Sequence, residues 1–193
     1  TNLAAVAISY EQIELSWTDN SDIETGFQVY RAENPSGPFL PIAIVGENQA
    51  SYNDTGLDAE TIYFYRVLAL GQYGDSGFSD EIKTGLEYAY YEGSFSDLDQ
   101  LLSATPTSTG ESPNFDLSPR QRNSNIAFRW EGNISLPADG DYRFFTRSDD
   151  GSELFIDGQQ VVFNDFDQGM TERSGTINQN AGTYPIDRKS TRL

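Results

Sequence analysis

Residues 148–158 read Ser-Asp-Asp-Gly-Ser-Glu-Leu-Phe-Ile-Asp-Gly, and this stretch decides the fold of the second half of the chain. Leu154 and Ile156 stand two positions apart, the spacing that is typical of one face of a β-strand. Asp-Gly pairs at 150–151 and 157–158 flank this strand, and such pairs supply the positive φ angles of tight turns. Residues 161–163, Val-Val-Phe, predict the next strand, so a hairpin tip is expected at 157–158.

This stretch also resembles the central signature of the PA-fourteen domain, a β-barrel module named after a toxin's protective antigen. The family occurs in bacterial glycosidases, bacterial adhesins and yeast-type flocculins. Further segments that match the family pattern lie on both sides, at residues 90–95, 128–134, 137–144, 174–177 and 181–186. The resemblance implies that residues 87–186 form a PA-fourteen-like domain.

In carbohydrate-binding members of that family, two successive aspartates joined by a cis peptide bond chelate a calcium ion, which holds vicinal hydroxyls of a sugar. Asp149 and Asp150 match these positions, so the resemblance implies that both are metal-binding and ligand-binding residues. Calcium prefers six to eight oxygen ligands, and two carboxylates on one turn supply a charged start. The alternative is that Asp-Asp-Gly-Ser is only favourable turn chemistry, with the Asp side chains capping backbone amides.

Residues 1–86 predict a separate all-β domain of short strands. Ile13, Leu15 and Trp17 share one face of a strand, and alternating residues at 63–70 predict another. These segments resemble a bacterial fibronectin type III domain, in which Trp17 occupies the core tryptophan position. Leu57, followed six residues later by Tyr63, matches the tyrosine corner of that family.

Composition excludes several classes of function. The net charge of −18 makes nucleic acid and anionic membranes poor partners, because both need a basic surface. The chain contains no His and no Cys, which removes thiol nucleophiles, His-based acid–base pairs and ordinary zinc sites. Two adjacent aspartates on one turn cannot flank a glycosidic bond as the carboxylates of a glycosidase do. The sequence therefore predicts a module that is not an enzyme.

Residues 187–193, Asp-Arg-Lys-Ser-Thr-Arg-Leu, are abruptly basic and resemble the translation of a common sequencing adapter. The PA-fourteen pattern expects a continuing strand after residue 186, then a Gly-rich loop that supplies the remaining calcium ligands, and a last strand. We therefore expect residues 187–193 to be a non-native tail and the second domain to be incomplete. A chain without that loop is expected to bind calcium weakly or not at all.

Together these features predict an all-β chain, a fibronectin-III-like β-sandwich followed by an incomplete PA-fourteen-like barrel or sandwich. The expected function is recognition of a carbohydrate (a glycan or polysaccharide) through calcium, with the sandwich as a spacer. The expected setting is extracellular or cell-surface, within a multidomain bacterial protein such as an adhesin or a glycan-degrading enzyme. The alternative is a structural or protein-interaction module without a sugar site.

Overall fold

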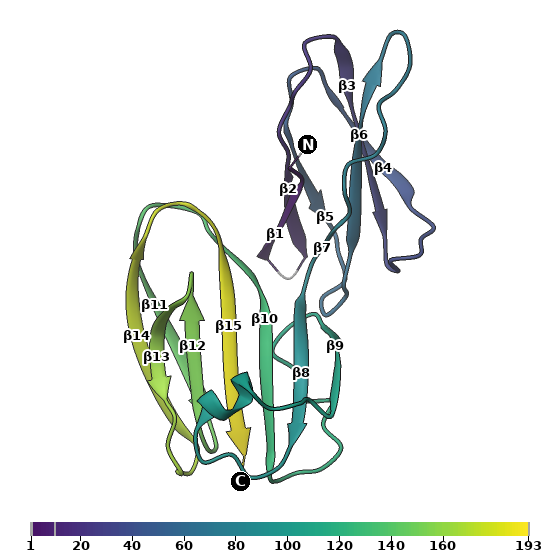
Figure 1. Cartoon of the computed structure of the whole chain (residues 1–193). Coiled ribbons are helices and arrows are strands. Elements are labelled where there is room, and N and C mark those ends of the chain that lie inside the picture. The colour runs from purple at the N-terminus through teal and green to yellow at the C-terminus, as the bar shows by residue number, and fades with distance from the viewer. Residues whose placement is uncertain (1, 10, 193) are drawn as a thin grey trace. The chain divides into compact units, whose positions relative to one another are not determined.

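The computed structural model describes residues 2–9 and 11–192. It divides into two compact units, Thr1–Gly85 and Leu86–Leu193, and the predicted boundary after residue 86 differs from this division by one residue. Strands dominate both units, which confirms the predicted all-β class (Figure 1).

The first unit is a sandwich of two antiparallel sheets. One sheet has the order β1-β2-β5 and the other the order β4-β3-β6-β7. The strands of the first sheet are β1 (Ala4–Ser9), β2 (Gln12–Ser16) and β5 (Ser51–Thr55). Those of the second are β3 (Glu24–Ala32), β4 (Leu40–Gly46), β6 (Phe64–Gly71) and β7 (Ile82–Lys83).

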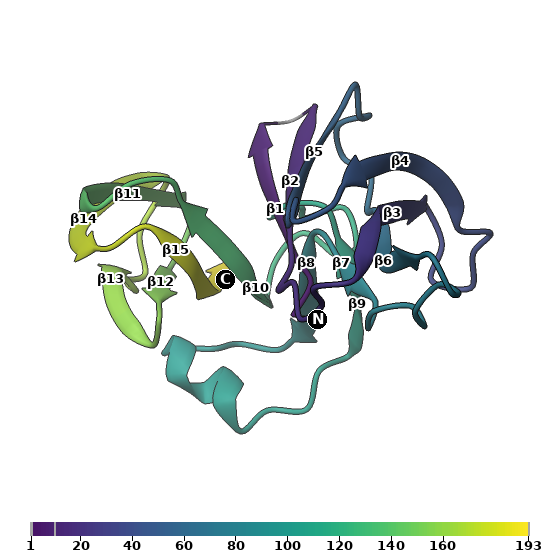
Figure 2. The same cartoon turned by 90° about the horizontal axis from the view of Figure 1, so that it is seen from above.

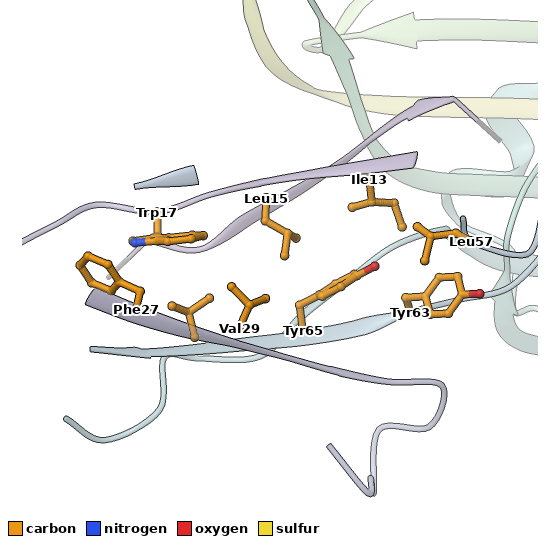
Figure 3. Close-up of a cluster of buried hydrophobic side chains, with 9 residues drawn as sticks. Ile13, Leu15, Trp17, Phe27, Val29, Leu57, Tyr63 and Tyr65 are labelled. Carbon is orange, nitrogen blue, oxygen red and sulfur yellow. The ribbon is translucent and has the colours of Figure 1, made fainter. Parts of the chain in front are cut away.

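Alternating side chains of the two sheets meet in one core. Figure 3 shows Ile13, Leu15 and Trp17 pointing toward Val29 and Tyr65 of the facing sheet. All five are buried, which confirms Trp17 as a core residue.

The predicted tyrosine corner is present in this unit. The backbone N–H of Asp58 donates to the Tyr63 hydroxyl over 3.0 Å, and Tyr63 itself is buried. Leu57 packs in the same core, as the resemblance implied.

The second unit is built on a larger antiparallel sheet with the order β13-β12-β15-β10-β8-β9. Its strands are β8 (Leu86–Glu92), β9 (Ser108–Ser112), β10 (Ile126–Leu136), β12 (Ser152–Ile156), β13 (Gln159–Asn164) and β15 (Gly182–Arg192). A second sheet pairs β11 (Gly140–Ser148) with β14 (Thr171–Gln179).

Two layers cover the larger sheet. Figure 2 shows β11 and β14 on one side of it and the short 3₁₀ helix η1 (Leu98–Leu102) on the other. Between the sheets lie Leu154, Ile156, Val162, Ile177 and Ile186. The same face of the larger sheet continues into a neighbouring aromatic cluster of Tyr90, Ile126, Phe128 and Trp130.

The last strand corrects the expectation for residues 187–193. Residues 187–192 continue β15, which pairs with β10 on one side and β12 on the other. Lys189 and Thr191 are buried there by groups on the face of the sheet. Lys189 pairs with Glu153 and with Asp99 of η1, and the Thr191 hydroxyl accepts a hydrogen bond from the backbone N–H of Gly151. In the structure, residues 187–192 are thus part of the central sheet and not a tail, while Leu193 lies outside the described residues. An adapter origin remains a hypothesis about the identity of these residues.

Candidate functional site

The site is built on the turn between β11 and β12. Ser148 ends β11, Ser152 begins β12, and the Asp149–Asp150 peptide bond between them is cis. The resemblance implied this cis bond, and the structure confirms it.

Gly151 was predicted to supply a positive φ angle, but the structure gives another reason for glycine at this position. Gly151 does not have a positive φ, whereas Asp157 and Gly158 of the other turn do, at 52° and 73°. A Cβ atom on Gly151 would collide with the Asp165 side chain and contact Thr191. Close approach of neighbouring segments, and not a left-handed backbone, therefore requires glycine at 151.

Hydrogen bonds hold both the carboxylate and the backbone of Asp150. Asp150 is 8% exposed, and its Oδ1 accepts a hydrogen bond from the backbone N–H of Gln168 over 3.3 Å. Its backbone N–H donates to the carbonyl of Thr191 over 2.9 Å, and its own carbonyl accepts from the Ser148 hydroxyl over 3.0 Å. These contacts fix the position of the carboxylate before any ligand arrives.

A buried polar network extends this support to the loop after β13. Asn164 is fully buried, and its amide nitrogen donates to the Ser148 hydroxyl over 3.2 Å. Its Oδ1 accepts from Gln168 Nε2 over 2.7 Å and from Arg173 Nε over 2.8 Å. Nothing in the local sequence pattern of residues 164–169 signals that Asn164 and Gln168 support Asp150.

Asp149 is placed differently from Asp150. It is half-buried and lines a pocket of about 270 Å³. Across residues 2–9 and 11–192, no group forms a hydrogen bond or an ion pair with its carboxylate. Both oxygens of Asp149 are thus available to a ligand in the pocket.

The pocket combines apolar and cationic walls. Its apolar lining includes Phe115, Leu117, Phe128 and Met170. Its cationic lining consists of Arg120, Arg147, Arg188 and Arg192. The walls therefore suit a ligand that carries both apolar and negatively charged parts.

A second group of acids lies on the other face of the larger sheet. Burial raises the pKa of Glu153 and of Asp165, and the carboxylate of Asp99 nearby adds to both shifts. Lys189 Nζ lies 3.4 Å from Glu153 Oε2 and 3.4 Å from Asp99 Oδ1. These acids hold a lysine and form part of the packing under η1.

The donor set at the turn suits calcium in kind but is partial. Asp149 and Asp150 offer carboxylate oxygens, the ligands that calcium prefers. Within the described part of the chain, no group of three or more Asp, Glu, His or Cys side chains is placed to hold a metal ion. Two protein carboxylates leave most of a six- to eight-oxygen shell to backbone carbonyls, water and ligand hydroxyls.

Comparison with known families gives the assignment. The model of the PA14 domain, the PA-fourteen family, matches residues 82–186. The chain belongs to the PA14 domain family. The model of the fibronectin type III domain matches residues 1–85, so both predicted resemblances are confirmed. Both matched families are typically non-catalytic modules.

Known proteins resemble parts of this PA14 chain. An amylopullulanase of Thermoanaerobacter thermohydrosulfuricus is 29% identical over 65 residues, which cover 33% of this chain and 4% of the enzyme. The PA14 domain of the antifreeze protein MpAFP is 22% identical with a TM-score of 0.45, covering 54% of this chain and 73% of that one. An Fn3-like protein from Clostridium thermocellum is 26% identical with a TM-score of 0.39, covering 42% and 84%.

Membrane insertion has no helical candidate in the described residues. None of their helices is long and apolar enough to span a bilayer.

Proposed function

We propose that the PA14 domain of this chain binds carbohydrate through a calcium ion held by Asp149 and Asp150. The observation that carries the proposal is the Asp149 carboxylate, which has no hydrogen-bond or ion-pair partner among residues 2–9 and 11–192 and lies on the wall of a pocket, next to the rigidly held Asp150. A carboxylate whose oxygens accept no hydrogen bond within the described residues can offer both of them to a cation.

The two aspartates take different parts in this proposal. Asp150, fixed by Gln168 and Ser148, supplies a preorganised anchor, so little ordering remains to be done when the cation binds. Asp149 faces the pocket and brings the cation within reach of a ligand there. Calcium, when bound, supplies a positive centre to which sugar hydroxyl oxygens can bind.

The apolar wall of the pocket fits the same ligand class. Phe115, which is 40% exposed, presents aromatic carbon to the pocket, and the C–H faces of a sugar ring pack on such surfaces. A volume of about 270 Å³ matches roughly one monosaccharide, since sites for larger drug-sized molecules span several hundred Å³.

The setting of the domain supports the proposal. A 65-residue segment of the chain is 29% identical to part of an amylopullulanase, which supports a polysaccharide-related, multidomain setting for the chain as a whole. We extend the proposal to an extracellular or cell-surface multidomain protein, in which the fibronectin type III unit spaces the PA14 domain from its neighbours.

Calcium-dependent retention on a glycan array tests the proposed function. Binding is measured with calcium, with a chelator, and for Asp149→Ala and Asp150→Ala. The expected result is retention on a subset of glycans that the chelator and either substitution abolish. Asp157→Asn is the matched control, because it removes one charge from the Asp-Gly turn at the other end of β12.

Two results decide against the proposal. Equal retention with and without calcium would show that calcium takes no part in glycan binding. Failure of the wild type to bind any glycan, with its fold intact, favours the structural or protein-interaction module.

A further inference from the structure

The pocket beside Asp149 gathers positive charge in a strongly acidic chain. Arg120, Arg147, Arg188 and Arg192 line it, which places four of the 12 Lys and Arg side chains around one small pocket. Against these stands one acidic lining residue, Asp149. With 30 Asp and Glu residues in the chain, such a concentration of arginine opposes the overall charge of −18.

The pocket arginines also differ from other arginines of the chain in their partners. Ion pairs with Asp or Glu hold Arg31, Arg66, Arg122 and Arg129. Across residues 2–9 and 11–192, none of the four pocket arginines has a carboxylate at ion-pair distance, and Arg120 interacts with Asp116 only through the longer-range attraction of their charges. Arg143 and Arg173 also form no ion pair within the described residues, but they bond to Ser174 and Asn164. The gathering of four arginines around one pocket is therefore what favours an anion there.

Two of these arginines come from segments far apart in the sequence. Arg147 lies near the end of β11, two residues before Asp149, and Arg120 belongs to the loop between β9 and β10. Both precede residues 187–193, so their presence does not depend on the origin of that segment. A guanidinium group donates two parallel N–H bonds to a carboxylate or a sulfate, a match that lysine cannot make.

We propose that this pocket binds the anionic group of an acidic saccharide, a uronate carboxylate or a sulfate ester, through Arg120 and Arg147. The inference rests on the proposed function and narrows its ligand class. Sugar hydroxyls are bound at the Asp149–Asp150 turn, while the anionic substituent lies toward the arginines. A neutral saccharide makes no charge-assisted bond to either guanidinium group, and these exposed side chains then stay hydrated.

Charge-matched ligands test this directly with the full chain. One pair is a short oligogalacturonate and its methyl ester, which have the same length and differ in charge. The other pair is a sulfated oligosaccharide and its desulfated form. Affinities are measured by calorimetry in the presence of calcium for the wild type, Arg120→Gln and Arg147→Gln.

The expected result is tighter binding of at least one charged ligand than of its neutral counterpart, with a loss on the order of tenfold or more in each variant. Arg143→Gln is the matched control, because Arg143 lies on the same strand, bonds to Ser174 and is outside the pocket. It should bind as the wild type does. Whether the uronate or the sulfate pair shows the difference identifies the anionic group.

The outcomes separate this inference from the proposed function. Calcium-dependent binding of neutral ligands that Asp149→Ala abolishes and Arg147→Gln leaves unchanged overturns the inference and leaves the proposed function standing. Arginine-dependent binding of charged ligands without calcium supports the inference and removes the metal from the proposed function. Binding of no saccharide, charged or neutral, overturns both.

Discussion

The backbone N–H of Gln168 lies 3.3 Å from Oδ1 of Asp150 and donates a hydrogen bond to it. The side chain of Gln168 also reaches the carbonyl of Asp150, over 3.4 Å. These two contacts tie the loop after β13 to the turn after β11. The candidate calcium ligand is therefore positioned by a residue 18 positions away, and the strength of the site depends on that loop.

Gln168→Ala should weaken calcium binding without unfolding the domain. The substitution removes the side-chain contacts to Asp150 and Asn164 but keeps the backbone N–H bond to Oδ1. Loss of a residue that orients a metal ligand commonly lowers affinity by about tenfold or more. Calorimetric titration with calcium measures the change. Gln160→Ala is the control, because Gln160 lies on the same strand as Asn164 and, within the described residues, its side chain bonds only to Glu153. It should leave the calcium affinity unchanged.

Trp17→Ala should severely destabilise the first unit. Trp17 is 5% exposed, and its ring centroid lies 5.5 Å from that of Phe27. Emptying such a site costs roughly 3–5 kcal/mol. Thermal unfolding of the full chain should show an earlier transition for this unit, and Trp17→Phe should shift it less. Equal melting of Trp17→Ala and the wild type would place Trp17 outside the core.

Tyr65→Phe should cost about 1–2 kcal/mol of unfolding free energy in the first unit. The Tyr65 hydroxyl donates to Asp54 Oδ2 over 2.9 Å, inside the core, where Arg31 also binds that carboxylate. The substitution leaves Asp54 buried with one donor fewer. Urea denaturation measures the loss. Tyr73→Phe changes a hydroxyl on an exposed side chain and should cost nothing.

The stability of the second unit should rise as the pH falls from 7 toward 5. Burial raises the pKa of Glu153 and Asp165, so the folded state binds protons more readily than the unfolded chain. The gain therefore begins as pH falls through the raised values and is complete below the ordinary values of 4.5 and 3.8. Denaturation at both pH values should show a smaller gain for Glu153→Gln. Asp157→Asn, an exposed acid, should follow the wild type, and an identical pH response in Glu153→Gln would contradict the assignment.

Ending the chain after Ile186 should abolish cooperative unfolding of the second unit and leave the first unit unchanged. Residues 187–192 pair with β10 and β12 at once, so their removal exposes two strand edges in the middle of the sheet. A chain that ends at Arg192 is the control. Unchanged melting of the shorter chain would show that the sheet does not need this strand and would support the tail hypothesis.

Local patterns in the sequence predicted much of the fold, because hairpins depend on neighbouring residues. The turn at Asp157-Gly158 and the strands on each side of it follow from such patterns. β9 was missed, since Ser108–Ser112 is a polar edge strand that pairs only with β8 and carries no apolar period.

The site was predictable only in part, because local patterns do not show which distant residues surround it. The cis Asp149–Asp150 turn followed from resemblance to the family. The surroundings of these residues could not be predicted, because Gln168 bonds to Asp150 from one distant loop and Arg120 lines the pocket of Asp149 from another, and the paths of both loops depend on tertiary packing. Residues 187–192 were predicted to be a tail because of their basic composition, yet in the structure they form a strand between β10 and β12.

A calcium titration monitored through the amide NMR signals tests the central claim most directly, because it locates the ion as well as detecting it. The account predicts weak binding, with shifts concentrated at residues 148–152 and 164–168, and their loss in Asp149→Ala and Asp150→Ala. Addition of a saccharide that the glycan array identifies as a ligand should increase the calcium affinity. Shifts that centre on other residues, or that persist in both variants, would contradict the account.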